Sequence, residues 1–132
     1  MKVPFGVLTA KNAVQFTVQG RVPAPATNYM TGAVALPYAV RILDVYYALR
    51  GVGTLVPGTI QLQVLANGTA LNATALQVSP TDTYASGRIR LDTEGQTFPA
   101  GTVFSVKVPF LGGTVETTVG LTIIGEIREP GS

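Results

Sequence analysis

The residues of this chain that can do chemistry are its carboxylates, because its 132 residues include no histidine and no cysteine. Without these residue types, Ser-His-Asp and Cys-His catalytic arrangements and ordinary zinc sites are excluded. Glycoside hydrolysis needs only two carboxylates, one as an acid and one as a base or nucleophile. The candidate pairs are Asp92 with Glu94 and Glu116 with Glu126.

The positions of these carboxylates argue against catalysis. Asp92 and Glu94 fall in a glycine-containing turn, where a carboxylate more often forms or caps the turn than acts as an acid. Asp82, Asp92 and Glu94 are also the best candidates for calcium ligands, but their spacing matches no calcium-binding loop. We therefore expect a protein that is not an enzyme, with no catalytic residue, no cofactor and no metal site.

The nine basic residues are scattered, and Arg88 and Arg90 are the only close pair. Nucleic-acid binding calls for clustered Lys and Arg with aromatic neighbours. On a strand these two arginines share one face, where solvated side chains are the more common outcome. We expect no nucleic-acid partner.

Aromatic residues leave carbohydrate binding as an alternative function. The chain has five tyrosines, five phenylalanines and no tryptophan. Phe16 and Phe104 fit inward strand positions. The tyrosines at positions 29, 38, 46 and 84 are the candidates for exposure, and Tyr46 and Tyr84 are equally consistent with subunit contacts and with platforms for sugars.

The composition indicates association. Hydrophobic residues make up 46% of the chain and charged residues 12%, whereas ordinary soluble domains carry about 25% charged residues. A domain of this size cannot hide so much apolar side chain internally, so we expect part of it to be buried against other subunits.

The dominant hydrophobic period is two, which is typical of half-buried strands. Glycine and proline turns separate about eight such segments, and no segment is confidently helical. The pattern predicts a single all-β domain, an antiparallel β-sandwich or jelly roll of about eight strands. The expected boundaries include a proline-rich connection over 21–30, a polar loop over 79–87, and strands over 14–20, 32–36, 87–91, 103–108 and 115–127. Pro109 is expected to close the strand over 103–108.

The longest apolar run, residues 39–49, changes phase. Val40 and Ile42 share one parity, whereas Val45 and Leu49 share the other with Leu43. The phase change predicts a β-bulge near Leu43, because an extra residue restores the buried face on both sides. A helix is the alternative, but the β-branched residues and tyrosines favour a strand.

Residues 59–71 predict a β-hairpin, because Asn67-Gly68 separates two apolar segments. The triplets starting at Asn67 and Asn72 match the N-glycosylation pattern. Without a recognisable signal peptide we interpret both as chance.

We expect three regions: an N-terminal arm at 1–12, the β-sandwich at 13–128 and a frayed tail at 129–132. The arm carries Val3, Phe5, Val7 and Leu8 ahead of the first well-patterned strand. It is either an edge strand of its own domain or an arm that docks on a neighbouring subunit. No apolar run is long enough to span a membrane.

Several stretches together resemble small bacteriophage virion proteins, the capsid decoration and head- or tail-fibre β-sandwiches. The matching stretches are Phe16–Gly20, Arg41–Val45, Gly58–Val64 with Asn67–Thr69, Gly101–Val106 and Gly120–Ile123. Such proteins often have Asp directly after a glycine where this chain has Thr102. The resemblance implies a non-enzymatic, trimeric shell protein that is attached to a capsid or tail.

Composition and resemblance together favour a structural protein of a viral particle that associates with copies of itself. The resemblance implies that it is a homotrimer that decorates and stabilises the shell and binds a major capsid or other virion protein. Its location is then the virion, after synthesis in the host cytoplasm. Low charge, loop prolines and the absence of thiols favour a thermostable assembly. The predicted contact residues are Val3, Phe5, Val7, Leu8, Tyr46 and Tyr84; the alternative is a glycan-binding module or adhesin tip.

Overall fold

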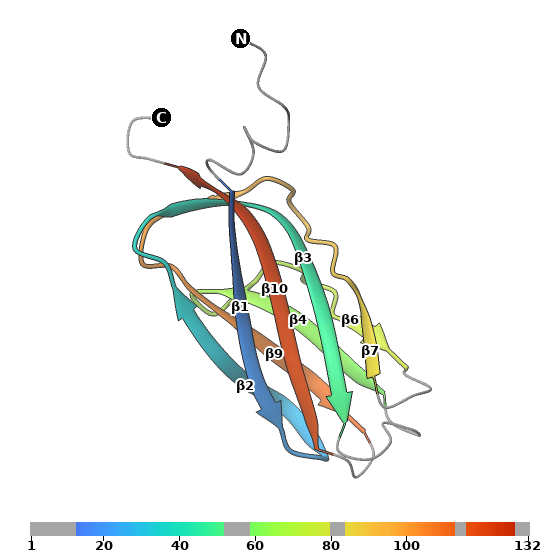
Figure 1. The fold of residues 1–132 in the computed structure, drawn as a ribbon. Coiled ribbons are helices and arrows are strands. Elements are labelled where there is room, and N and C mark those ends of the chain that lie inside the picture. Colours follow the sequence, from blue (N-terminus) through green and yellow to red (C-terminus); the bar gives the residue numbers. More distant parts are fainter. Residues whose placement is uncertain (1–12, 52–58, 80–83, 113–115, 129–132) are drawn as a thin grey trace.

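The computed structural model of this protein describes residues 13–51, 59–79, 84–112 and 116–128. Its strands form two antiparallel sheets that pack as layers (Figure 1). Sheet A has the order β1 (Ala13–Val22), β10 (Thr117–Arg128), β3 (Ala39–Gly51), β7 (Tyr84–Arg88), with β8 (Thr97–Phe98) also paired to β3. Sheet B has the order β2 (Ala26–Ala35), β9 (Val103–Leu111), β4 (Ile60–Ala66), β5 (Thr69–Ala70), with β6 (Leu76–Val78) also paired to β4.

The strand pairs are nested along the chain. β1 pairs with β10, β2 with β9, β3 with β7 and β4 with β6. Successive pairs alternate between sheets A and B, so the chain is one long antiparallel ribbon folded over on itself. This topology is the jelly roll. It confirms the predicted all-β sandwich, and the eight nested strands match the predicted number, because β5 and β8 have only two residues each.

The core lies between the sheets and is built of apolar side chains, as period-two alternation requires. Phe104 of β9 links the layers: its ring centroid lies 5.4 Å from that of Phe16 in β1 and 5.4 Å from that of Phe98 in β8. Of the two phenylalanines that were expected to point inward, Phe104 is buried, and Phe16 is half-buried and packs against the core.

The predicted β-bulge in β3 is confirmed. Asp44 pairs with Ile124 and Ile42 pairs with Gly125, so Leu43 is the extra residue. Leu43 is exposed, whereas Ile42 and Val45 on either side of the bulge are buried. The bulge therefore keeps both apolar segments of this long strand on the core side, and the helical alternative is wrong.

Pro109 does not end its strand, contrary to expectation, because β9 continues to Leu111. In the ladder with β2, Tyr29 pairs with Val108 and Thr27 with Phe110. Asn28 and Pro109 thus lie opposite each other without pairing, and the alternation of burial changes phase there, because Val108 and Leu111 are both buried. Pro109 also lies where the ladder of β9 with β4 shifts register, between the Leu111–Ile60 and Lys107–Gln63 pairs. Proline is tolerated in a sheet at such an irregularity, where no ladder hydrogen bond needs its missing N–H.

Two further boundaries were predicted wrongly. Residues 26–30 belong to strand β2 and are not a connection. The prediction failed because Asn28, which has a φ of 49°, interrupts the alternation of buried and exposed side chains. The strand predicted over 87–91 starts at Tyr84 and ends at Arg88. Ile89 is nevertheless buried, and its N–H donates to the Val45 carbonyl oxygen at 2.8 Å.

The predicted hairpin is confirmed at its turn. Asn67 and Gly68 both have positive φ, 49° and 83°, as a type I′ turn demands. The return strand β5 is only two residues long, and Asn72 then takes over its role. The buried Asn72 amide accepts from the Val64 N–H at 2.8 Å and donates to the Leu62 carbonyl at 3.1 Å. The Asn72 side chain thus replaces the ladder hydrogen bonds to β4 in the gap between β5 and β6.

Candidate functional site

Charge divides the two outer faces of the sandwich. Lys107 is the one charged residue on the strands of sheet B. By contrast, the strands of sheet A carry Arg21, Arg41, Asp44, Arg50, Arg88, Glu126 and Arg128. The two faces therefore suit different partners. The face of sheet B suits a partner with an apolar surface, and the face of sheet A suits a partner with a polar surface.

On sheet A, the strand register places outward side chains in rows across the strands. One row runs from Arg21 through Thr118 and Arg50 to Tyr84. The next row contains Gln19, Gly120, Ala48 and Ser86. The row beyond contains Thr17, Thr122, Tyr46 and Arg88.

On β10, β3 and β7 the middle row carries small side chains between two rows of larger ones, and Gly120 and Ala48 form the floor of a groove of about 380 Å³. Neighbouring rows on one face of a strand are about 7 Å apart, so the groove is wide enough for an extended chain. It is lined by Thr17, Gln19, Ala48, Leu49, Arg50, Tyr84, Thr118, Gly120 and Thr122.

Beside the groove, Asp44 organises two side chains. Its Oδ1 accepts a hydrogen bond from Arg88 Nε at 2.7 Å, and its Oδ2 accepts one from the Tyr46 hydroxyl at 3.0 Å. The hydrogen bond to the Asp44 carboxylate raises the pKa of the Tyr46 hydroxyl above its ordinary value, and the same carboxylate raises the pKa of Arg88. Both side chains are thereby held in fixed positions on the surface.

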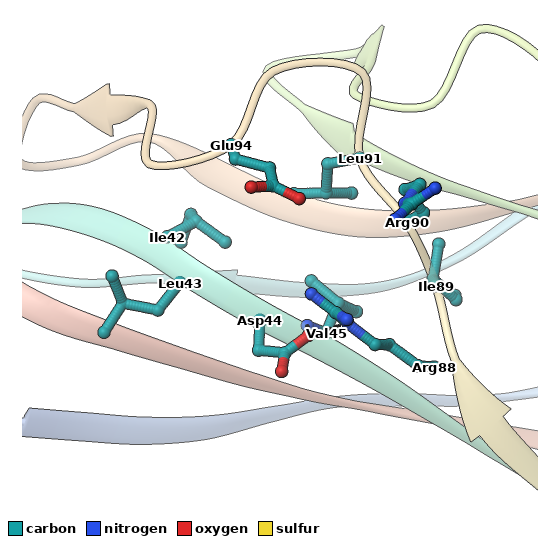
Figure 2. A pocket seen from close by; sticks show the side chains of 9 residues that line it. All are labelled: Ile42, Leu43, Asp44, Val45, Arg88, Ile89, Arg90, Leu91 and Glu94. Atoms are coloured by element: carbon teal, nitrogen blue, oxygen red, sulfur yellow. Dashed lines mark hydrogen bonds and ion pairs between the residues drawn. The ribbon is translucent and has the colours of Figure 1, made fainter.

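Next to this network lies a small crevice between β3 and the chain that follows β7 (Figure 2). Asp44 and Arg88 point toward one another on one side of it, and Glu94 and Leu91 lie on the other side. Its volume is about 10 Å³, which is room for no more than one water molecule. The crevice is therefore no substrate pocket.

The outer face of sheet B is neutral and carries exposed apolar side chains. Met30, Val103 and Phe110 are 54%, 40% and 44% exposed. Met30 and Val103 border a broad, shallow hollow of about 770 Å³, whose other lining residues are Thr31, Gly32, Ala33, Asn67, Gly68 and Ser105. Exposed methionine and aromatic side chains with few charges are the composition of interface cores.

Among the carboxylates that the sequence singled out, Asp92 has a structural role. Asp92 accepts a hydrogen bond from the Ala73 N–H at 2.8 Å, which ties two loops together. Glu116 precedes β10 and Glu126 lies near its other end, so a separation of about 30 Å is expected along an extended strand. Catalytic carboxylates stand about 5 to 10 Å apart. The described residues also include no group of three or more side chains that could hold a metal ion.

Two of the predicted contact residues lie among the described residues. Tyr46 and Tyr84 are 43% and 67% exposed, and both lie on the outer face of sheet A. Of these two tyrosines, only Tyr84 lines the groove. The other four, Val3, Phe5, Val7 and Leu8, lie outside the described residues, as does Asp82. The boundaries of the arm, domain and tail also stay predictions.

Sequence reasoning missed the groove and the apolar face of sheet B. The signal for the apolar face was present, because the segments that form β2, β4 and β9 have almost no charge. The signal for the groove required the register, since Gly120 and Ala48 become neighbours only when β10 pairs with β3.

Comparison with solved structures supports the fold. A chain of the cyanophage Pam1 capsid asymmetric unit is similar over 89% of this chain and 86% of that chain, with a TM-score of 0.60 and 18% identity. A chain of the Helicobacter pylori bacteriophage KHP30 capsid has a TM-score of 0.46 and 12% identity, covering 89% of this chain and 95% of that chain. No protein-family model and no curated protein sequence matches the chain. The described residues contain no helix long and apolar enough to cross a membrane.

Proposed function

We propose that this protein is a non-enzymatic structural component of a virus particle, which binds the shell as a homo-oligomer, in keeping with the predicted trimer. Jelly-roll domains build many viral shells, and the fold of this chain is similar to that of a cyanophage capsid chain. That similarity concerns the fold alone, so the proposal needs support from the surface of this chain.

The observation that carries the proposal is the outer face of sheet B. Its strands hold one charge, Lys107, and it exposes Met30, Val103 and Phe110. A free surface of this kind is costly in water, and it is stabilised when a second apolar surface covers it. We infer that copies of this chain associate through this face, which also accounts for the low charge content of the chain.

The predicted arm, residues 1–12, gives a second means of association if it docks on a neighbouring subunit through Val3, Phe5, Val7 and Leu8. Tyr46 lies on sheet A, away from the Met30 face, so a contact through Tyr46 belongs to a different surface. A particle protein with neighbours on one side and a shell beneath it needs more than one such surface.

The test is the mass of the protein in solution, measured by light scattering after size-exclusion chromatography. The unmodified chain of 13.8 kDa is expected to elute as an oligomer at micromolar concentration. Replacing both Met30 and Val103 with lysine places charges on the apolar face and is expected to shift the protein to smaller species. Gln15→Lys on the outer face of sheet A is the matched control and leaves the mass unchanged.

A strictly monomeric unmodified protein contradicts the proposal. So does an oligomer that the Met30→Lys, Val103→Lys protein retains while it stays folded by circular dichroism. Binding to empty phage shells in a co-sedimentation assay then tests the attachment itself.

A further inference from the structure

Gly120 on the floor of the sheet A groove is a glycine that the fold does not require. It lies in the middle of β10, where glycine weakens a strand, and it does not have a positive φ. A Cβ at this position would meet only the Ala48 carbonyl oxygen, at 3.9 Å, which is ordinary contact. Glycine within a strand often marks a place where a ligand approaches the backbone closely. Gly120 and Ala48 keep the floor of the groove low.

The chemistry of the walls is polar and uncharged except for one arginine. Thr17, Thr118 and Thr122 present hydroxyls, and Gln19 presents an amide. No carboxylate of the described residues lines the groove. Such walls offer hydrogen bonds to a ligand that itself carries many hydroxyl groups.

Tyr84 and Arg50 lie opposite each other on paired strands at one side of the groove. The Tyr84 side chain is 67% exposed, so its ring is open to a flat apolar partner such as one face of a sugar. Among the residues that the structure describes, Arg50 makes no ion pair, whereas Arg88 across the groove is held by Asp44 at 2.7 Å. Within the described part of the chain no carboxylate holds the Arg50 guanidinium, and it can bind a carboxylate of a ligand through two parallel hydrogen bonds.

We propose that this groove binds an acidic saccharide chain, with a sugar ring on Tyr84, a carboxylate of the chain on Arg50 and the backbone of the chain over Gly120. The charge of the groove complements such a ligand. An apolar peptide arm is a poorer occupant, because Leu49 is the only large aliphatic residue among the described residues of the lining, and its side chain is buried. A nucleic acid is also a poorer occupant, since it needs several cations for its phosphates and the lining supplies one.

The test begins with a printed array of oligosaccharides that includes uronic-acid chains, sialylated chains and neutral chains of equal length. The protein is expected to bind acidic chains and to bind them less as salt increases. The best of them is then titrated calorimetrically. Gly120→Leu, which fills the groove, is expected to weaken binding at least tenfold, and Tyr84→Ala and Arg50→Ala are expected to weaken it as well.

Gln15→Leu is the matched control, because it also adds an exposed leucine to the outer face of sheet A but outside the groove lining. It is expected to bind as the unmodified protein does. The proposal is wrong if no acidic chain on the array binds, if neutral chains bind as strongly, or if Gly120→Leu leaves affinity unchanged. Equal binding of a single-stranded oligothymidylate assigns the groove to nucleic acid instead and also overturns it. Light scattering of the same variants is expected to give an unchanged mass, because their substitutions lie on sheet A and the proposed association uses sheet B. A loss of saccharide binding at unchanged mass is therefore independent of that association.

Discussion

At the scale of single residues, Asn72 shows how a polar side chain can act as part of a sheet. Its amide satisfies the Val64 N–H and the Leu62 carbonyl, which β5 and β6 leave without a strand partner. Asn72 is 3% exposed. The acceptor asparagine of the glycosylation triplet that begins at this residue is therefore buried in the folded protein.

We predict that Asn72→Ala lowers the free energy of unfolding by about 3 kcal/mol, because it leaves a buried donor and a buried acceptor unpaired. Denaturant unfolding monitored by circular dichroism measures this. Asn72→Asp is the informative comparison, since a protonated carboxyl can donate to the Leu62 carbonyl and an ionised one cannot. The Asp variant should gain stability relative to the Ala variant as the pH falls through the carboxyl pKa. Equal loss in both variants at every pH would show that the two hydrogen bonds contribute little.

Tyr46 supplies a second prediction at this scale. Its hydrogen bond to Asp44 raises the pKa of the hydroxyl above the ordinary value of 10.0. Because the folded state holds this proton more tightly, its contribution to stability is present below pH 10.0 and is lost as the pH rises through the raised pKa. Asp44→Asn should return the Tyr46 pKa toward the ordinary value. Absorbance titration at the phenolate band, with Tyr46→Phe subtracted, measures the shift; an unchanged pKa in Asp44→Asn would contradict the assignment.

At the scale of the element, two glycines in β10 have different roles. The bulge at Leu43 brings the Arg41 carbonyl oxygen within 2.9 Å of the position that a Cβ on Gly125 would take. Gly120, five positions earlier in the same strand, has no such neighbour. The bulge therefore requires glycine at position 125 and not at position 120.

The corresponding prediction is that Gly125→Ala destabilises the protein by about 1 to 3 kcal/mol, because the added methyl group forces the backbone of β3 to move. Gly120→Ala should be neutral or slightly stabilising, since alanine loses less conformational entropy on folding than glycine. Thermal unfolding of the two variants beside the unmodified protein compares them directly. Similar melting temperatures for both variants would show that the bulge tolerates a side chain at position 125.

The strands that the sequence predicted well are those with uninterrupted alternation, such as β1 and β10, and the bulge in β3 was readable from its phase change. The errors fall where an irregularity interrupts the alternation, at Asn28 in β2 and Pro109 in β9. The groove could not be predicted, because it depends on which strands pair. Local periodicity carries information about which face is buried but none about the neighbour across the sheet.

At the scale of the whole molecule, the jelly roll separates two surfaces with different chemistry on one small domain. The neutral face of sheet B suits contact with other copies, and the grooved face of sheet A remains available to a ligand of a different kind. The two edge strands β1 and β2 lie close together, because Gly20 leaves no side chain between its backbone and Thr31. The sandwich is thus closed along that side, and its partners must approach the faces, the ends or the β7 side.

The arm provides the last prediction. β1 begins at Ala13, which pairs with Glu126 of β10, so removing residues 1–12 leaves every described strand and its ladder complete. We expect the truncated chain to unfold at nearly the same temperature as the full chain and to dissociate at higher concentration, because Val3, Phe5, Val7 and Leu8 no longer dock on a neighbour. Replacing those four residues with serine in the full chain is the control for length, and it should reproduce the weaker association. If the truncated chain instead fails to fold, the arm is an internal strand of its own domain, and the proposed docking on a neighbour is wrong.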